Sequence, residues 1–321
     1  MAEPTRRTQD AEDTRRLVIG TRASKLALWQ TEHVRSLLLA RNPGLDIEYT
    51  RITTKGDAIT DRPLAEIGRN SLFVAEIEDA LREGRIRFAV HSAKDLPSTL
   101  APDMSIGAFL TRADARDVLV SAGHVPFDRL PHGARVGTSS PRRNCQLRAW
   151  RNDLRLVDIR GNVDTRLEKL HRGEYDAIVL AAAGLERLGL SSVVTEYFAV
   201  DAMIPAVAQG ALAVEIRAGD AEAAALIGAL DDPTTSVAVR AERAFLAAMG
   251  AGCNAPLGAH ARVSGNHLTV SALIGSSDGT LLTAEARGSL DEAESLGEQL
   301  AQRLTADGGS VLLQGVARTH G

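Results

Sequence analysis

Short apolar segments alternate with amphipathic segments at the start of the chain. The run RLVIGTR at 16–22 is typical of a buried strand. Ser24 stands where a helix N-cap is expected, and the helix that it opens is expected to end near Asn42. A second helix is indicated by helical spacing of the apolar residues Phe73, Ile77, Ala80 and Leu81. We expect strands at 16–22, 46–54 and 87–91, helices at 24–42 and 72–84, and a long polar loop at 55–71.

The same order of segments then recurs. IGTRASKLALW (19–29) and VGTSSPRRNCQLRAW (136–150) both run from a strand into a helix, and the second helix is expected to start after Pro141, because proline suits the first helical turn. REGRIRFAVHSA (82–93) likewise matches HRGEYDAIVLAA (171–182) in pattern. We therefore predict two similar α/β lobes. The second has expected strands at 135–140, 155–160 and 175–182 and a helix at 163–172.

The last third of the chain has a different pattern. Residues 201–217 have strand character with a turn at Gly210, and helices are expected at 221–230 and 234–249. Polar and apolar positions then alternate in LGAHARV, NHLTVSALIG and TLLTAEARG, before a final helix at 291–306. This predicts a small α+β domain with an antiparallel sheet, and Pro233 is the candidate linker to it.

Composition narrows the function classes. A length of 321 residues predicts two or three domains. A net charge of -4 and 3% aromatic residues argue against a nucleic-acid partner. Two cysteines form no disulfide framework and no CxxC pair, and the scattered histidines suggest no metal site. The polar N-terminus has no secretory pattern and the apolar runs are too short for a membrane span, so we expect a cytoplasmic protein with a disordered tail at 1–15.

Four segments at expected strand ends or helix starts gather basic and hydroxyl side chains. They are GTRAS (20–24), HSAKD (91–95), GTSSPRR (137–143) and RGNVDTR (160–166). In α/β folds ligands bind at the carboxyl ends of strands and at helix N-termini. Such a cleft on an acidic protein indicates an anionic ligand, and spaced arginines suit several carboxylates better than a nucleotide, since no phosphate-loop motif is present.

Four further residues have a functional and a purely structural interpretation. Asp95 is the one acid in its basic segment, and it is either a carboxylate that stabilises a developing cation or a local ion-pair partner. Cys253 lies in a glycine-flanked turn, which suits a nucleophile or an attachment point as well as an inert thiol. His91 follows an apolar strand and is expected to be a core residue rather than a base, and Cys145 is expected to be an inert thiol within a helix.

Over roughly nine-tenths of its length the chain resembles the porphobilinogen deaminase (hydroxymethylbilane synthase) family. The motifs that carry the resemblance occur in the expected order. They are IGTRASKLALWQ, TTKGD, AVHSAKDLP, VGTSSPRRNCQL, DIRGNVDTRL, GEYDAIVLAAAGLERLGL, AVAQGAL and ERAFLAAMGAGCNAPLG.

The resemblance implies two lobes of the type II periplasmic-binding-protein kind and a third domain. The expected boundaries are 16–110 with 211–230, 111–210, and 231–321 for the domain that attaches the cofactor. It also implies an enzyme, a transferase that joins four porphobilinogen molecules into the linear tetrapyrrole hydroxymethylbilane and releases four ammonia. The implied cofactor is a dipyrromethane, bound by a thioether to Cys253. A monomer without metal is expected.

The resemblance also assigns site residues. Asp95 is the implied catalytic residue. The implied cofactor contacts are Cys253, Ser92, Lys94, Asp95, Thr138, Ser140, Arg142, Arg143 and Arg166. The implied substrate contacts are Arg22, Ser24, Gln30, Arg160, Arg166, Arg187 and Gln209.

The chain departs from the family pattern at a few positions. Gly68-Arg69-Asn70-Ser71 replaces a usual Gly-Gly-Lys-Gly in the long loop, which affects the expected rate more than the reaction type. Ala251 and Ala208 each replace a usual glycine. A diverged paralogue, a non-enzymatic anion-binding protein and the effector module of a transcription regulator are the alternatives. A covalent adduct at Cys253 would separate the enzyme from the two binding modules.

Overall fold

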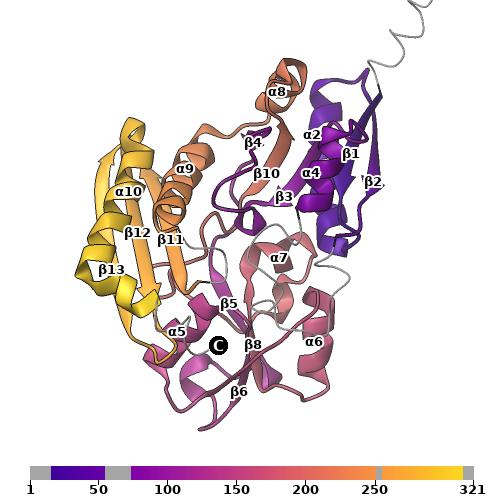
Figure 1. Cartoon of the computed structure of the whole chain (residues 1–321). Coiled ribbons are helices and arrows are strands. Elements are labelled where there is room, and N and C mark those ends of the chain that lie inside the picture. Colours follow the sequence, from indigo (N-terminus) through magenta and orange to yellow (C-terminus); the bar gives the residue numbers. More distant parts are fainter. Residues whose placement is uncertain (1–15, 55–73, 251–254, 314–321) are drawn as a thin grey trace, which may run out of the picture.

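The computed structural model describes residues 16–54, 74–250 and 255–313 (Figure 1). The tail at 1–15, the loop at 55–71 and Cys253 are sequence predictions that lie outside the described residues.

The first lobe is built on a five-stranded sheet of order β2-β1-β3-β10-β4. Strands β1, β2 and β3 are parallel, whereas β10 is antiparallel to both β3 and β4. The strands are β1 (Arg16–Thr21), β2 (Asp46–Arg51), β3 (Phe88–Ser92), β4 (Met104–Phe109) and β10 (Leu212–Arg217), and the helices are α2 (Lys25–Arg41), α4 (Ala75–Arg82) and α8 (Ala221–Gly228). Since β10 returns from far along the sequence, the chain crosses between the lobes twice.

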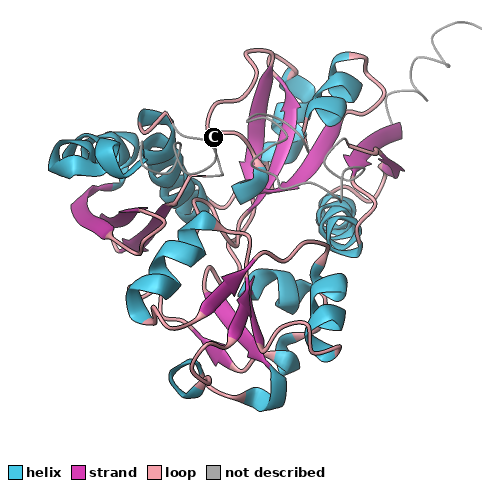
Figure 2. Ribbon diagram, turned by 60° about the horizontal axis from the view of Figure 1, so that its bottom comes forward, coloured by secondary structure: helices cyan, strands magenta, loops and turns pink. Residues whose placement is uncertain are grey.

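The second lobe repeats this arrangement in the order β7-β6-β8-β5-β9. Here β5, the first strand after the crossing, is antiparallel to its neighbour β8. The strands are β5 (Asp117–Ser121), β6 (Arg135–Gly137), β7 (Arg155–Val157), β8 (Ala177–Ala181) and β9 (Glu196–Tyr197), and the helices are α5 (Pro141–Trp150), α6 (Val163–His171) and α7 (Ala182–Arg187). Figure 2 shows the two sheets with helices around them.

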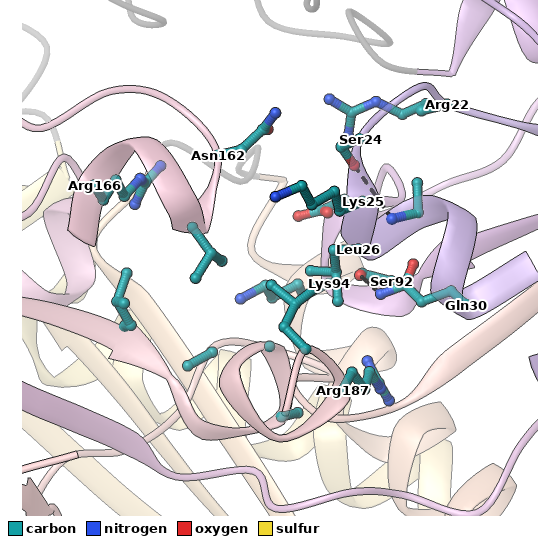
Figure 3. Close-up of a pocket in the computed structure, with 18 of the residues that line it drawn as sticks. Arg22, Ser24, Lys25, Leu26, Gln30, Ser92, Lys94, Asn162, Arg166 and Arg187 are labelled. Atoms are coloured by element: carbon teal, nitrogen blue, oxygen red, sulfur yellow. Dashed lines mark hydrogen bonds between the residues drawn. The ribbon is translucent and has the colours of Figure 1, made fainter. Parts of the chain in front are cut away.

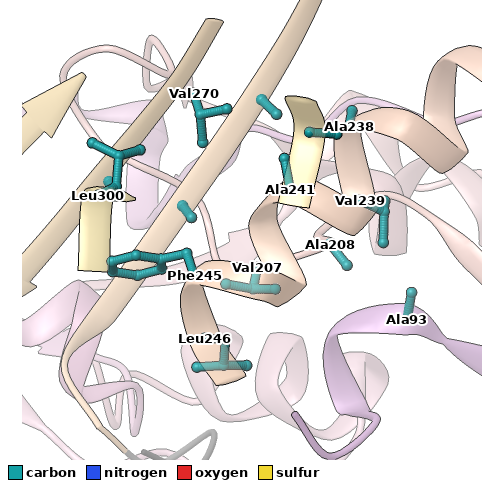
Figure 4. Close-up of a cluster of buried hydrophobic side chains, with 14 of the residues drawn as sticks. Ala93, Val207, Ala208, Ala238, Val239, Ala241, Phe245, Leu246, Val270 and Leu300 are labelled. Carbon is teal, nitrogen blue, oxygen red and sulfur yellow. The ribbon is translucent and has the colours of Figure 1, made fainter. Parts of the chain in front are cut away.

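The C-terminal part packs an antiparallel sheet against two helices. The strands are β11 (Leu257–Ser264), β12 (His267–Gly275) and β13 (Leu281–Ser289), and the helices are α9 (Pro233–Ala248) and α10 (Ala293–Leu304). One apolar cluster joins Phe245 and Leu300 of this part to Ala93, Val207 and Ala208 of the lobes (Figure 4). The segments that flank the site residues Lys94 and Gln209 are therefore anchored on the C-terminal core.

The predicted fold class of two α/β lobes and a C-terminal antiparallel domain is confirmed. The predicted cap at Ser24 is also confirmed, because its side chain accepts a hydrogen bond from the Ala27 amide. The structure adds a second cap that was not predicted: the Ser140 side chain accepts from the Arg143 amide at the start of α5. The exact domain boundaries stay a prediction.

Some expectations were wrong. Only 212–217 of the segment 201–217 form a strand. Residues such as Ile204 and Val207 are apolar because they are buried in the connection between the lobes. Pro233 is no linker but the first residue of α9, whose N-cap is Asp232. Strands β4 and β5 were not predicted at all.

Candidate functional site

A cleft of about 810 Å³ lies between the two lobes. Its walls come from the start of α2 and the end of β3 on one side, and from the starts of α6 and α7 on the other (Figure 3). The volume is in the range of small-molecule sites. The predicted site residues that line the cleft are Arg22, Ser24, Gln30, Ser92, Lys94, Asp95, Arg143, Arg160, Arg166, Arg187 and Gln209.

The first lobe supplies a rigid polar wall. Gln30 is buried on α2, and its Nε2 donates to Ser92 Oγ at 2.8 Å, which fixes the hydroxyl at the end of β3. Ser24 Oγ accepts from the Ala27 amide at 3.2 Å, so the start of α2 is held by its own cap. Both residues therefore order the wall that faces the cleft.

Lys94 and Asp95 lie in the short 3₁₀ turn Ala93–Asp95 that follows β3. Lys94 Nζ donates to Gln209 Oε1 at 3.3 Å. Burial lowers the pKa of Lys94 to about 8, while the nearby Asp95 carboxylate opposes that shift. Asp95 itself is exposed to the cleft. Among the described residues that line the cleft, the other carboxylate is Asp164, which pairs with Lys25 at 2.7 Å.

The second lobe supplies arginines that lie close to one another. Arg166 Nε donates to the Gly161 carbonyl at 2.8 Å. Burial, reinforced by the charges of Arg143 and Arg160, lowers the pKa of Arg166 to about 10. Burial also lowers the pKa of Arg187 to about 10, and its Nη2 donates to the Gly210 carbonyl at 2.6 Å. Since crowded and desolvated cations favour bound anions, this wall suits carboxylate groups.

Two of the predicted arginines are held inside the protein by an acid that the sequence analysis missed. Arg142 does not line the cleft, and its Nη1 lies 2.7 Å from Asp117 Oδ2 and donates to the Ile204 carbonyl at 2.7 Å. Arg143 reaches the cleft, but its Nε and Nη2 donate to Asp117 Oδ1 at 3.0 and 2.6 Å. The one available signal was an acid at the start of an apolar run in RADARDVLVS, which is too common to single out.

The remaining predicted residues have local roles in the fold. Thr138 and Ser140 do not line the cleft; Thr138 Oγ1 accepts from the Ser140 amide at 3.2 Å, and Ser140 Oγ caps α5. The core assignment of His91 is confirmed, because it is buried with its Nε2 2.9 Å from Glu215 Oε2. Cys145 is buried as predicted, and burial raises the pKa of its thiol to about 11.

Two further findings concern the described ranges. No cluster of three or more potential metal-ligating side chains occurs in 16–54, 74–250 and 255–313. None of the helices in those ranges is both long and apolar enough to cross a bilayer.

Two family models match the chain. "Porphobilinogen deaminase, dipyromethane cofactor binding domain" matches residues 17–225, and "Porphobilinogen deaminase, C-terminal domain" matches residues 236–306. The chain is 56% identical over 299 residues to a protein named porphobilinogen deaminase from Roseiflexus castenholzii, covering 93% of this chain and 99% of that one. It is 48% identical to the protein of that name from Geobacter sulfurreducens, covering 93% of this chain and 94% of that one.

The chain also has weak likenesses to solved structures. An ancestral cationic amino acid solute binding protein matches with a TM-score of 0.44 at 14% identity, over 69% of this chain and 90% of that one. The VFT2 domain of BvgS from Bordetella pertussis matches with a TM-score of 0.41 at 16% identity, over 71% of this chain and 91% of that one. These likenesses are too weak to add to what the strand order shows.

Proposed function

Since the chain belongs to the porphobilinogen deaminase family, we propose that it joins four porphobilinogen molecules head to tail into hydroxymethylbilane and releases four ammonia. The observation that carries the proposal is the cleft between the lobes, which gathers cations from both sides around the exposed carboxylate of Asp95. Porphobilinogen carries an acetate and a propionate group, so each added unit brings two carboxylates that the cleft must neutralise.

The lining residues fit the dipyrromethane cofactor that the matched family domain binds. Its carboxylates suit the desolvated cations Lys94, Arg143 and Arg166, which lie on both walls. Cys253, the proposed attachment point, lies outside the described residues. When bound, the dipyrromethane supplies the terminal pyrrole carbon to which the first substrate is joined. Arg22, Arg160 and Arg187 line the rest of the cleft and are proposed to hold substrate carboxylates.

Asp95 is the proposed catalytic residue. When the bond from the methylene carbon to the protonated amino group breaks, ammonia leaves with the bonding electrons and a cationic methylene pyrrole remains. The Asp95 carboxylate stabilises this cation and accepts a hydrogen bond from a pyrrole N–H. The pyrrole carbon that forms the new bond must give up its proton, and Asp95 is the proposed acceptor.

The two crossings between the lobes offer a hinge. Hinge motion at such crossings is a common way for two lobes to open and close around a ligand. We propose that opening accommodates the growing chain of pyrroles. We also propose that the protein is cytoplasmic and has neither a metal nor a nucleic-acid partner. We propose further that it acts as a monomer, which sedimentation of the active enzyme would test.

The central test is intact mass combined with product analysis. The purified chain is expected to carry a mass excess of two linked pyrrole units, to release ammonia from porphobilinogen and to form hydroxymethylbilane. Cys253→Ala is expected to lose the mass excess and the activity, whereas the matched control Cys145→Ala keeps both. Binding of porphobilinogen without ammonia release would instead favour a non-enzymatic anion-binding protein.

A further inference from the structure

Asp117 is a fully buried carboxylate at the junction of the two lobes. It is the first residue of β5, directly after the chain crosses from the first lobe, and its side chain is 0% exposed. Two guanidinium groups of α5 surround it. Arg143 donates twice to Oδ1, and Arg142 Nη1 lies 2.7 Å from Oδ2. A buried carboxylate is tolerated only with such partners.

A third contact links this carboxylate to the first lobe. Gln209 Nε2 donates to Asp117 Oδ1 at 3.0 Å and to the Ala115 carbonyl at 2.8 Å. The other end of the same amide, Oε1, accepts from Lys94 Nζ at 3.3 Å. Lys94 precedes Asp95 in the chain, so a continuous path of hydrogen bonds connects Asp117 to the residue beside the proposed catalytic carboxylate.

We propose that Asp117 is a positioning residue: it fixes Arg143 in the cleft wall and, through Gln209, holds Lys94 beside Asp95. This inference rests on the proposed function, because its effect is read in the binding of porphobilinogen. These contacts do more than stabilise the fold, since Asp117 connects Arg143 of the second lobe, through Gln209, to Lys94 of the first. A carboxylate used only to neutralise α5 would not need the link through Gln209 to the first lobe.

Charges support this arrangement. The charged groups that act most strongly on Lys94 include Asp95 of its own turn, Arg142 and Arg143 of α5, and Asp117. The arginines lower the pKa of Lys94, whereas Asp95 and Asp117 raise it. Removing the charge of Asp117 therefore makes Lys94 lose its proton at a lower pH.

The test compares two substitutions at one position with a matched control. Asp117→Asn keeps the shape and removes the charge, and Asp117→Glu keeps the charge and lengthens the side chain. Asp176→Asn is the control, because Asp176 also forms a two-point contact with an arginine, Arg135, on the second lobe but is half exposed and lies outside the cleft. The readouts are the KM for porphobilinogen from pH 6.5 to 9.5 and the fraction of purified chains that carry the cofactor, measured by intact mass.

Asp117→Asn is expected to raise KM about tenfold, because its two buried arginines lose their counter-ion. It is also expected to move the rise of KM at alkaline pH to lower pH and to reduce the cofactor-bearing fraction. Asp117→Glu is expected to restore the alkaline limb to its wild-type position even where stability is lower. If Asp117→Asn folds poorly, Asp117→Glu still decides the question. This variant keeps the charge, so a rise of KM that begins at lower pH than in the wild type would contradict the proposal.

The inference fails if Asp117→Asn, like Asp176→Asn, has the wild-type pH dependence of KM and the wild-type cofactor-bearing fraction. A wild-type chain that forms no hydroxymethylbilane would overturn the proposed function instead. The two failures are therefore distinguishable.

Discussion

The two lobes use one local motif in different ways. Gly20-Thr21-Arg22 leads from β1 to the Ser24 cap of α2, and Gly137-Thr138 leads from β6 to the Ser140 cap of α5. In the first lobe the basic residue lies before the cap and lines the cleft. In the second lobe the basic residues lie inside the helix, where Asp117 binds them.

The strands that follow differ more strongly. The end of β3 continues into Ala93–Asp95, which carries Lys94 and Asp95, whereas the end of β8 continues into the largely apolar helix Ala182–Arg187. The two lobes therefore contribute different groups to the cleft. The first lobe supplies Asp95, and the other carboxylate that lines the described part of the cleft, Asp164, is paired with Lys25. The second lobe supplies most of the arginines.

The largest effect on activity is expected when the two cleft carboxylates are neutralised one at a time, which tests whether the chemistry belongs to the first lobe. Asp95→Asn is expected to reduce kcat about 10³-fold, because the substitution removes the charge that stabilises the cationic intermediate. Asp164→Asn on the second lobe removes a partner of the exposed Lys25 and is expected to change kcat less than about threefold. Single-turnover release of ammonia measures both. Equal losses in the two variants would contradict the assignment of the chemistry to the first lobe.

The second lobe holds arginines of two kinds, which stability measurements separate. Arg142→Leu is expected to lower the free energy of unfolding by about 3 kcal/mol, because it breaks a buried ion pair and leaves the Ile204 carbonyl without that donor. Arg166→Leu loses the bond to the Gly161 carbonyl and is expected to cost under about 1 kcal/mol while weakening porphobilinogen binding. Urea unfolding of both proteins checks the order, and a more stable Arg142→Leu variant would refute it.

Lys94 of the first lobe is expected to make the KM for porphobilinogen depend on pH. With a pKa of about 8, Lys94 loses its charge above pH 8, and KM is expected to rise there about tenfold by pH 9. Lys94→Met is expected to have a high KM that no longer changes over this range. The unfolded chain binds more protons between pH 8 and the ordinary pKa of 10.5, so this group raises stability as pH rises through that window. A wild-type KM that is flat to pH 9 would rule out Lys94 as the titrating group.

Much of the fold could be predicted because its signals are local. The cap at Ser24, the helix start near Pro141 and the alternation in 257–289 depend on neighbouring residues, and the structure has them where the sequence placed them. Strands β4 and β5 were missed because they are defined by their pairing with β10 and β8, far away in sequence.

The cleft residues were predictable for a similar reason. Strand ends and helix starts converge at one edge of a sheet, so the sequence indicated that Ser24 and Lys94 lie together in the first lobe. The recurrence of the same pattern in the second lobe added Arg166. The role of Asp117 could not be foreseen, since its partners Arg142 and Gln209 come from separate parts of the chain. Sequence indicates which residues can reach a site, but not which of them the fold has already paired.

The smallest predicted effect concerns the connection that both lobes share. Ala208 has a φ of 60°, a left-handed conformation that costs a residue with a Cβ about 1–2 kcal/mol. The Ala208 amide donates to Glu242 Oε2 at 2.6 Å, which holds the backbone in place next to Gln209. Ala208→Gly relieves the strain but adds freedom to the unfolded chain, so a net gain of about 0.5–1 kcal/mol is expected.

Gly210, two residues on, is the matched control. Its φ is 90°, and a Cβ there would lie 2.5 Å from the Ala113 carbonyl oxygen, so Gly210→Ala is expected to destabilise where Ala208→Gly stabilises. Urea unfolding of the cofactor-free chains measures both. A loss of stability in Ala208→Gly would mean that the alanine methyl, packed in the cluster with Ala93 and Val207, contributes more than the backbone strain costs. The connection would then hold the two lobes by side-chain packing, and the strained φ at position 208 would be its by-product.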